Sequence, residues 1–349
     1  MPDVRAGSYP PAGPDVPPGS RVLLVLARSD GGVGRHVQSL AAGLIERGHQ
    51  VKVAGPAATG RTFCFPIYVE LEIGERSRPA RDALALRRLR RLARQADVVH
   101  AHGLRAGALA VLSPGRIVVT LHNAVDSRFG ALLEKLVARR ARVVLVASDD
   151  LGERARALGA RDVRLGPVAA PALVARGVDP GLGHPLVLAV GRLQAQKGYD
   201  TLVAALPLLG DAVVAVAGDG PLRASLEAAA PEIRWLGRRD DIADLLAAAD
   251  VVVLPSVWEA RSLTAQEALR AGRPLVATAV GGLPALLGDG AVLVPPGDAV
   301  ALGLAVRRLL DDPAAAAAVA ARGRAVAASW PTEQDTVTQV AALYAELLG

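Results

Sequence analysis

The sequence predicts an α/β protein with buried parallel sheets and enough residues for two domains, and three observations support this fold class. First, the stretch from Val251 to Pro284 has the pattern of a buried strand, a loop, a helix and a second strand, which is one βαβ unit. Second, 51% of the residues are apolar but only 3% are aromatic, which is typical of proteins whose Val- and Leu-rich strands are buried on both faces. Third, a chain of 349 residues is long enough for two domains of about 150 residues each.

Charge and cysteine content exclude several classes of protein. Lysines and arginines number 40 against 34 acids, a net charge of +6. This mild excess suits a phosphorylated ligand or an anionic membrane surface, and it is too dispersed to indicate nucleic-acid binding. The single cysteine, Cys64, excludes an internal disulfide, and no apolar run reaches the roughly 18 residues that a membrane span needs. We therefore expect a cytoplasmic protein, with the inner face of the plasma membrane as one place where it can act.

The beginning of the chain has no apolar segment. Residues 1–19 are rich in proline, so we expect a disordered tail and no signal peptide. A strand follows over residues 21–27, and Gly31, Gly32 and Gly34 open a helix that runs to about Arg47. Glycines at such a turn let the backbone approach an anion. A dinucleotide-binding dehydrogenase is disfavoured, because the pattern is G-G-x-G and the next strand, residues 50–55, ends without an acid.

Three further strands are predicted at residues 98–102, 117–122 and 143–147. The first contains His100 and His102, an H-x-H pair that raises the question of a metal site. No third ligand has motif spacing, so we expect no metal. The second ends in Thr120-Leu-His122, where the histidine is either structural or directed at a ligand.

A loop with two cations follows the strand at residues 186–191. It runs from Arg192 to Lys197 and Gly198. Lysine is rare here, since only Lys52 and Lys135 are found besides Lys197, so a compact ammonium at this position is a candidate phosphate ligand. The alternative is a solvated loop charge.

Two carboxylates lie in the βαβ unit where strands end and helices begin, which is where parallel sheets bind ligands. Glu259 is in the loop, and Glu267 is in the first turns of a helix that stops at Gly272. Thr264 and Glu267 also have the spacing of a capping box, in which Glu267 would only satisfy a backbone amide. Spacing alone leaves both interpretations open.

Four motifs in this order resemble those of retaining glycosyltransferases of family 4, the group 1 glycosyl transferases: G-G-x-G, T-x-H, R-x4-K-G and E-x7-E. In the last motif, Arg261 stands at the family's aromatic position and Ser262 at its glycine. The resemblance implies the GT-B fold, with two Rossmann-like domains facing a cleft. The expected domains are an acceptor domain at residues 20–170, a donor domain at 171–331 and a final helix at 332–349 that crosses back.

The resemblance also implies roles for individual residues. Arg192 and Lys197 would neutralise the leaving diphosphate without a metal or other cofactor. Glu259 would hold the transferred sugar and His122 would orient it or stabilise the transition state. The other implied donor-binding residues are Gly31, Gly32, Arg238, Ser262, Leu263, Thr264 and Glu267, of which Glu267 would bind the ribose hydroxyls and Arg238 lies where relatives hold the base.

The predicted activity is transfer of a sugar from a UDP- or GDP-sugar, with retention, to an unidentified acceptor such as a membrane-surface lipid or a cell-envelope glycan precursor. A sugar-nucleotide epimerase of the same fold and a non-catalytic nucleotide-sugar-binding protein are the alternatives. Residues 80–95 form a predicted amphipathic helix like the basic helix of phosphatidylinositol mannosyltransferases, with Leu84 on its basic side. Its candidate membrane contacts are Arg87, Arg88, Arg90 and Arg91, and the alternative is a helix whose arginines are simply solvated.

Overall fold

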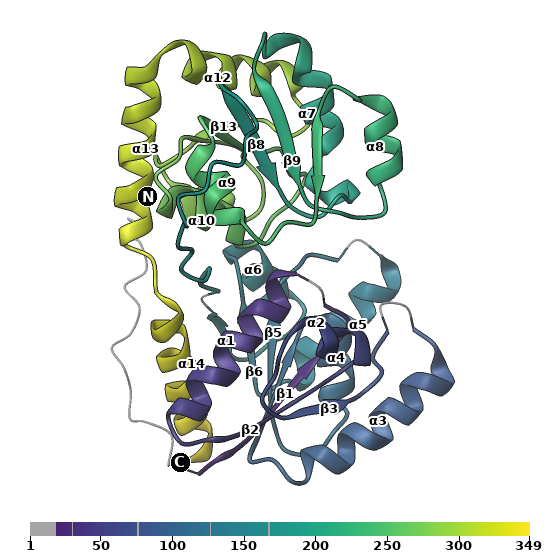
Figure 1. Ribbon diagram of the computed structural model, residues 1–349. Coiled ribbons are helices and arrows are strands. Elements are labelled where there is room, and N and C mark those ends of the chain that lie inside the picture. The colour runs from purple at the N-terminus through teal and green to yellow at the C-terminus, as the bar shows by residue number, and fades with distance from the viewer. Residues whose placement is uncertain (1–18, 30, 75–76, 126, 167) are drawn as a thin grey trace. The chain divides into compact units, whose positions relative to one another are not determined.

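The computed structural model describes residues 19–29, 31–74, 77–125, 127–166 and 168–349 (Figure 1). The predicted tail at residues 1–19 lies outside these residues except for Gly19. The chain divides into two compact units. Unit 1 contains the chain up to Val168 together with Pro331–Gly349, and unit 2 contains Ala169–Trp330.

Unit 1 is built on a seven-stranded parallel sheet with strand order β3-β2-β1-β4-β5-β6-β7. The order reverses between β1 and β4, the arrangement of a doubly wound sheet. The strands are β1 (Arg21–Leu26), β2 (Gln50–Gly55), β3 (Tyr68–Glu70), β4 (Val98–His102), β5 (Arg116–Leu121), β6 (Val143–Val146) and β7 (Val163–Leu165).

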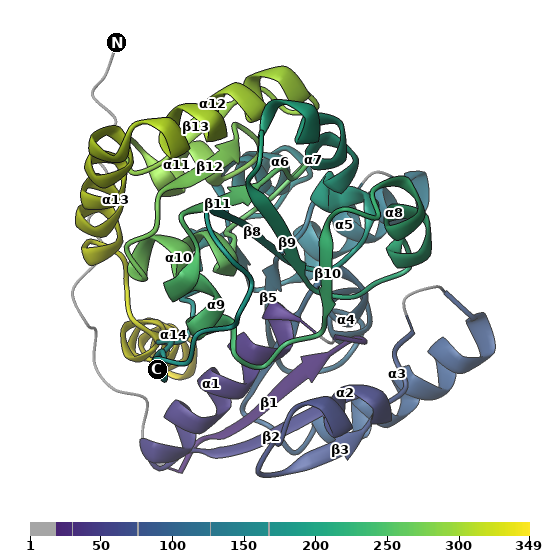
Figure 2. The same cartoon turned by 45° about the horizontal axis from the view of Figure 1, so that its top comes forward.

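Helices cover both faces of this sheet. They are α1 (Gly32–Glu46), α2 (Ala57–Thr62), α3 (Pro79–Ala93), α4 (Leu104–Ala110), α5 (Arg128–Arg140), α6 (Asp149–Ala157) and α14 (Glu333–Leu348). The last helix, α14, packs beside α1 (Figures 1 and 2). Val340 and Tyr344 of α14 share a core with Leu40 of α1 and Val98 of β4. The opposite face carries α4 and α5, where a Cβ on Gly107 would lie 2.6 Å from a methyl group of Val119.

Unit 2 is built on a six-stranded parallel sheet with strand order β10-β9-β8-β11-β12-β13. The strands are β8 (Leu186–Val190), β9 (Val213–Ala217), β10 (Arg234–Gly237), β11 (Val251–Leu254), β12 (Leu275–Thr278) and β13 (Val292–Val294). The helices are the short 3-10 turns η1 (Ala195–Lys197) and η2 (Leu206–Leu208), then α7 (Tyr199–Ala205), α8 (Arg223–Ala229), α9 (Ile242–Ala248), α10 (Leu263–Arg270), α11 (Leu283–Leu287), α12 (Ala299–Asp311) and α13 (Pro313–Ala328).

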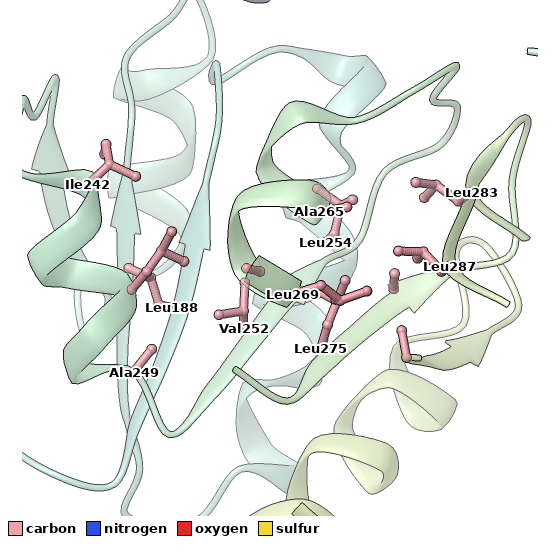
Figure 3. Close-up of a cluster of buried hydrophobic side chains, with 14 of the residues drawn as sticks. Leu188, Ile242, Ala249, Val252, Leu254, Ala265, Leu269, Leu275, Leu283 and Leu287 are labelled. Atoms are coloured by element: carbon pink, nitrogen blue, oxygen red, sulfur yellow. The ribbon is translucent and has the colours of Figure 1, made fainter. Parts of the chain in front are cut away.

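Strand β11 is apolar at every position because both of its faces are buried. Val252 and Leu254 point into one core together with residues of α9, α10 and α11, as Figure 3 shows. Val251 and Val253 point into a second core on the other side of the sheet. A parallel strand buried on both faces loses the alternation of polar and apolar residues that a half-exposed strand shows.

These two parallel sheets confirm the predicted α/β fold class. The predicted amphipathic helix is α3, and the helix of the βαβ unit is α10, which ends before Gly272 in its left-handed conformation (φ +66°). Within the described residues, no helix combines the length and the apolar composition needed to cross a bilayer.

Candidate functional site

The centre of the site in unit 2 is an ion pair between the rare lysine and the first glutamate of the E-x7-E motif. Lys197 Nζ donates to Glu259 Oε1 at 2.5 Å, and the hydroxyl of Ser256 donates to the same oxygen at 2.8 Å. The Lys197 side chain is 16% exposed and the Glu259 side chain 8%. Lys197 is therefore not the solvated loop charge that the sequence left open.

Two hydrogen bonds, one between backbone groups and one from a side chain, join the loop that carries Lys197 to the loop that carries Glu259. The amide of Val257 donates to the carbonyl of Gln196 at 2.8 Å, and Gln196 Nε2 donates to the carbonyl of Trp258 at 2.9 Å. Gly198 permits this contact, because a Cβ there would lie 2.1 Å from the carbonyl oxygen of Pro255.

A turn after β12 supports the Glu259 loop from another side. The amide of Gly282 donates to the carbonyl of Glu259 at 2.9 Å. Gly281 has φ +52°, and a Cβ at this position would lie 2.1 Å from the same carbonyl oxygen. The hydroxyl of Thr278 donates to the carbonyl of Ser256 at 2.5 Å. The position of Glu259 thus depends on a glycine turn more than 20 residues later in the chain, a range typical of one βαβ unit.

Helix α10 brings its N-terminus to the same place. Its N-cap is Ser262, whose hydroxyl accepts from the amide of Ala265 at 3.3 Å. Thr264 lies inside the helix, and its hydroxyl donates to the carbonyl of Val190 at 3.3 Å, at the end of β8. The capping box suggested by the spacing of Thr264 and Glu267 is therefore wrong, because Thr264 is not the N-cap. Glu267 is buried, with 5% of its surface exposed, in the second turn of the helix.

The remaining predicted residues of unit 2 lie at the same edge of the sheet. Arg192 is half-buried and lies two residues after β8, and Leu263 is the first residue of α10. Arg238 is exposed and follows β10, two strands from β8 in the strand order. Since all strands of this sheet are parallel, these positions share its carboxyl edge. Backbone amides at the N-terminus of α10 add partial positive charge there, which suits an anion.

In unit 1, the predicted His122 belongs to a buried cluster of imidazoles. The cluster consists of His36 on α1, His100 and His102 on β4, and His122 directly after β5. His102 stacks on both of its neighbours, with ring centroids 4.2 Å from His100 and 5.6 Å from His122, and His36 meets His102 and His122 edge-on. Gly31 and Gly32 lie at the start of α1, which also carries His36. No group of three or more His, Cys, Asp or Glu side chains in the described residues could hold a metal ion.

Burial keeps this cluster neutral. Desolvation lowers the pKa of His36 to about 4 and that of His100 to about 3. It also lowers the pKa of His102 and of His122 well below the usual range, with repulsion among the imidazoles as a smaller cause. All four rings are therefore uncharged near neutral pH.

The sequence did not indicate His36 or Tyr344 as parts of this cluster. Tyr344 Oη lies 2.7 Å from His100 Nδ1 across 244 positions of the sequence. His36 lies four residues before Leu40 on the buried side of α1. The four-residue spacing between His36 and Leu40 predicts that His36 lies on the buried face of this helix. No local pattern in the sequence predicts that Tyr344 contacts His100.

The arginines of α3 are exposed, as predicted. Arg87, Arg88, Arg90 and Arg91 all face solvent, and Arg90 Nε also donates to the carbonyl of Leu112 at 2.9 Å. The apolar stripe of α3 is directed inward, since Ala85, Leu89 and Ala93 are buried. Leu84 is 70% exposed on the basic side.

Comparison with known proteins agrees with these motifs. Residues 30–181 match the family described as Glycosyltransferase Family 4, and residues 184–312 match Glycosyl transferases group 1. The chain is 31% identical to glycogen synthase of Mycobacterium tuberculosis, over 89% of this chain and 90% of that protein. It is 31% identical to phosphatidyl-myo-inositol mannosyltransferase of Mycobacterium leprae, over 81% of this chain and 84% of that protein.

Two further matches complete the comparison. A 2-deoxystreptamine glucosyltransferase of Streptomyces kanamyceticus is 36% identical, over 49% of this chain and 48% of that protein. Among solved structures, Anabaena HepE in complex with UDP and glucose has a TM-score of 0.79 at 19% identity, over 93% of this chain and all of that chain. Sequence, fold and motifs agree that this chain belongs to glycosyltransferase family 4, a family of retaining, metal-independent enzymes with the GT-B fold.

Proposed function

We propose that this protein transfers a sugar from a UDP- or GDP-sugar to an acceptor hydroxyl with retention of configuration. The observation that carries the proposal is the Lys197–Glu259 pair beside the N-terminus of α10. It combines a cation and helix amides suited to a diphosphate with a carboxylate suited to sugar hydroxyls.

In this proposal, the cations act on the leaving group. When the bond between the anomeric carbon and the diphosphate breaks, negative charge grows on the departing phosphate oxygens. Arg192, Lys197 and the first amides of α10 stabilise that charge, which is the role a metal ion has in other transferases. Glu259 holds the transferred sugar and Glu267 accepts hydrogen bonds from the ribose. Arg238 contacts the base.

The residues of unit 1 complete the proposed set. The glycines at positions 31 and 32 allow the donor's phosphates to approach the start of α1, and His122 orients the sugar. UDP and glucose in the structure of HepE, and the sugar-transferring relatives, support a nucleotide-sugar donor.

A panel of nucleotide sugars, with and without candidate acceptors, tests this function. Release of free nucleotide that depends on an acceptor is the expected result. Tight binding without turnover would favour a non-catalytic nucleotide-sugar-binding protein. Turnover that yields an isomerised sugar nucleotide, with no transfer, would favour an epimerase.

We further propose that the acceptor lies at an anionic membrane surface on the cytoplasmic side. The exposed arginines of α3 support an electrostatic contact, worth roughly 1 kcal/mol for each basic residue near the surface. The apolar stripe of α3 is buried against the protein, so this helix has only Leu84 to insert.

Helix α5 offers the apolar contact that α3 lacks. Phe129 and Leu132 lie three residues apart and are 52% and 65% exposed, with Arg128 and Lys135 exposed next to them. The one acid of α5, Glu134, is buried and paired with Arg154 Nε at 2.7 Å. Helix α4 packs against both α3 and α5, so the arginines of α3 and the apolar pair of α5 belong to helices that flank the same neighbour.

Co-sedimentation with anionic liposomes tests the membrane proposal. Reversing Arg87, Arg88 and Arg91 to Glu should abolish sedimentation and leave nucleotide binding intact, and Arg90 is kept because of its bond to Leu112. The matched control reverses three exposed arginines of unit 2, which are Arg234, Arg308 and Arg324. Equal loss in both variants, or no sedimentation of the unchanged protein at low salt, would favour an acceptor in solution.

A further inference from the structure

The two nitrogens of His122 have different surroundings. Nε2 lies 3.4 Å from Nδ1 of His102, a long hydrogen-bonding distance. Nδ1 of His122 has no hydrogen-bond partner within the described residues. The ring is therefore engaged by the protein on its Nε2 side, while Nδ1 remains for a ligand.

The surroundings of His102 indicate which ring carries the proton that lies between His102 Nδ1 and His122 Nε2. A neutral imidazole has one donor nitrogen and one acceptor nitrogen. Nε2 of His102 is buried and has no hydrogen-bond partner in the described part of the chain. A proton on this atom would be a buried N–H without an acceptor, which is rarer in proteins than an acceptor with an unused lone pair. The favoured arrangement places the proton of His102 on Nδ1, where it is donated to Nε2 of His122.

We propose that His102 and His36 are positioning residues that hold His122 as its Nδ1–H tautomer. His122 then offers the bound sugar a hydrogen-bond donor and does not act as a general base. The inference rests on the proposed function only for the identity of the ligand. The tautomer itself follows from contacts inside unit 1.

The other members of the cluster fix the orientation of His102. Nδ1 of His100 lies 2.7 Å from Tyr344 Oη, and Nε2 of His100 lies 2.6 Å from Thr120 Oγ1. Both nitrogens of His100 are thus held by hydroxyl groups, and its ring stacks on His102. His36 meets the rings of His102 and His122 edge-on, at 5.4 and 5.7 Å between centroids. The rings of His102 and His122 cannot rotate without disturbing their neighbours, because protein interiors are closely packed.

Nitrogen-15 NMR of the full-length protein tests the tautomer directly. The chain has six histidines, so labelled imidazoles give few signals, and a His122→Asn variant assigns the one of interest. We expect His122 to be neutral at pH 7, with the proton on Nδ1 and a bare Nε2. A proton on Nε2 of His122 in the unchanged protein overturns the proposal, whether or not any transfer activity is found.

Substitutions at His102 test the positioning role. His102→Asn keeps a donor group near the place of Nδ1, whereas His102→Leu removes it. We expect the Asn variant to keep the tautomer of His122 and the Leu variant to give a mixture of both tautomers. In a transfer assay, the Leu variant should lose about tenfold in kcat, the effect of one hydrogen bond, with little change in the KM of the donor. Unchanged His122 signals in a folded Leu variant overturn the role of His102, and equal losses in both variants argue for a general packing effect.

Discussion

Unit 1 should lose stability under mildly acidic conditions because of the four histidines of its buried cluster, His36, His100, His102 and His122. An ordinary imidazole has a pKa of 6.5, and burial lowers the pKa of each of these four, to about 4 for His36 and about 3 for His100. The unfolded chain therefore binds more protons than the folded protein as the pH falls below about 6.5. By linkage, the free energy of unfolding decreases with falling pH in this range and is fully retained above it.

The size of the effect follows from the ordinary pKa. A histidine that is neutral when folded and titrates at 6.5 when unfolded contributes a loss of about 1.4 kcal/mol between pH 7.5 and pH 5.5. The four together lose about 5 kcal/mol, a large part of the stability of about 5 to 15 kcal/mol of a typical domain. Hydrogen bonds, against the opposing effect of burial, lower the pKa of four acids of unit 1, Asp82, Asp97, Asp335 and Glu346. Because the ordinary pKa is 3.8 for Asp and 4.5 for Glu, these four stay ionised at pH 5.5.

The distribution of tryptophan makes the assay specific. The three tryptophans, Trp235, Trp258 and Trp330, all lie in unit 2, whereas the four histidines lie in unit 1. Urea unfolding is followed at both pH values by tryptophan fluorescence, which reports unit 2, and by circular dichroism, which reports both units. We expect the transition of unit 1 to move to lower urea at pH 5.5. Transitions at the same urea concentration at both pH values would refute the reasoning.

The remaining predictions concern unit 2. Activity should survive excess EDTA, and Lys197→Ala should lose on the order of 10² in rate because a charge-stabilising group is removed; complete dependence on added Mg²⁺ would contradict this. Glu267→Gln should weaken binding of UDP or GDP in calorimetry, and unchanged affinity would mean that Glu267 does not bind the ribose. Gly281→Ala should reduce transfer much more than Gly288→Ala, since both have positive φ (+52° and +51°) but only Gly281 approaches a carbonyl; equal rates would exclude a role for that contact.

The sequence was most informative where the pattern is local. Short stretches of sequence predict the apolar strand β11 and the glycine that ends α10. They also predict that Glu259 and Lys197 lie near strand ends. The spacing of Thr264 and Glu267 left a capping box open, because Ser262 and Thr264 are both hydroxyl residues near the helix start. Only the structure shows that the Thr264 hydroxyl binds the carbonyl of Val190 in β8.

Contacts between distant segments were beyond the sequence. The H-x-H spacing identifies His100 and His102 as a pair, but Tyr344 reaches His100 only because α14 packs beside α1 and β4. The support of Glu259 by Gly281 and Gly282 likewise depends on two adjacent strands ending at the same edge. Such contacts depend on the register of the strands and on how the helices pack, and the spacing of residues in the sequence does not predict either of them.

Glu259 is the counter-ion of Lys197, so the charge of Glu259 should affect both the stability of the ligand-free protein and its affinity for the donor. A largely buried ammonium is costly without a counter-ion, so Glu259 has this role before a donor binds. When the diphosphate arrives, it supplies negative charge to Lys197, and the Glu259 carboxylate becomes available for sugar hydroxyls. Glu259→Gln keeps an oxygen for Ser256 and Lys197 but removes the charge, so the ligand-free variant should be less stable by about 1 to 3 kcal/mol.

The same variant should bind UDP or GDP at least as tightly as the unchanged protein, because the diphosphate no longer competes with a carboxylate for Lys197. Its melting temperature should therefore rise more on addition of nucleotide, while its rate of sugar transfer should fall. Differential scanning calorimetry with and without nucleotide measures both shifts. A smaller rise in the variant would mean that Lys197 stays bound to Glu259 in the nucleotide complex, and that the diphosphate is held by Arg192 and the amides of α10 alone.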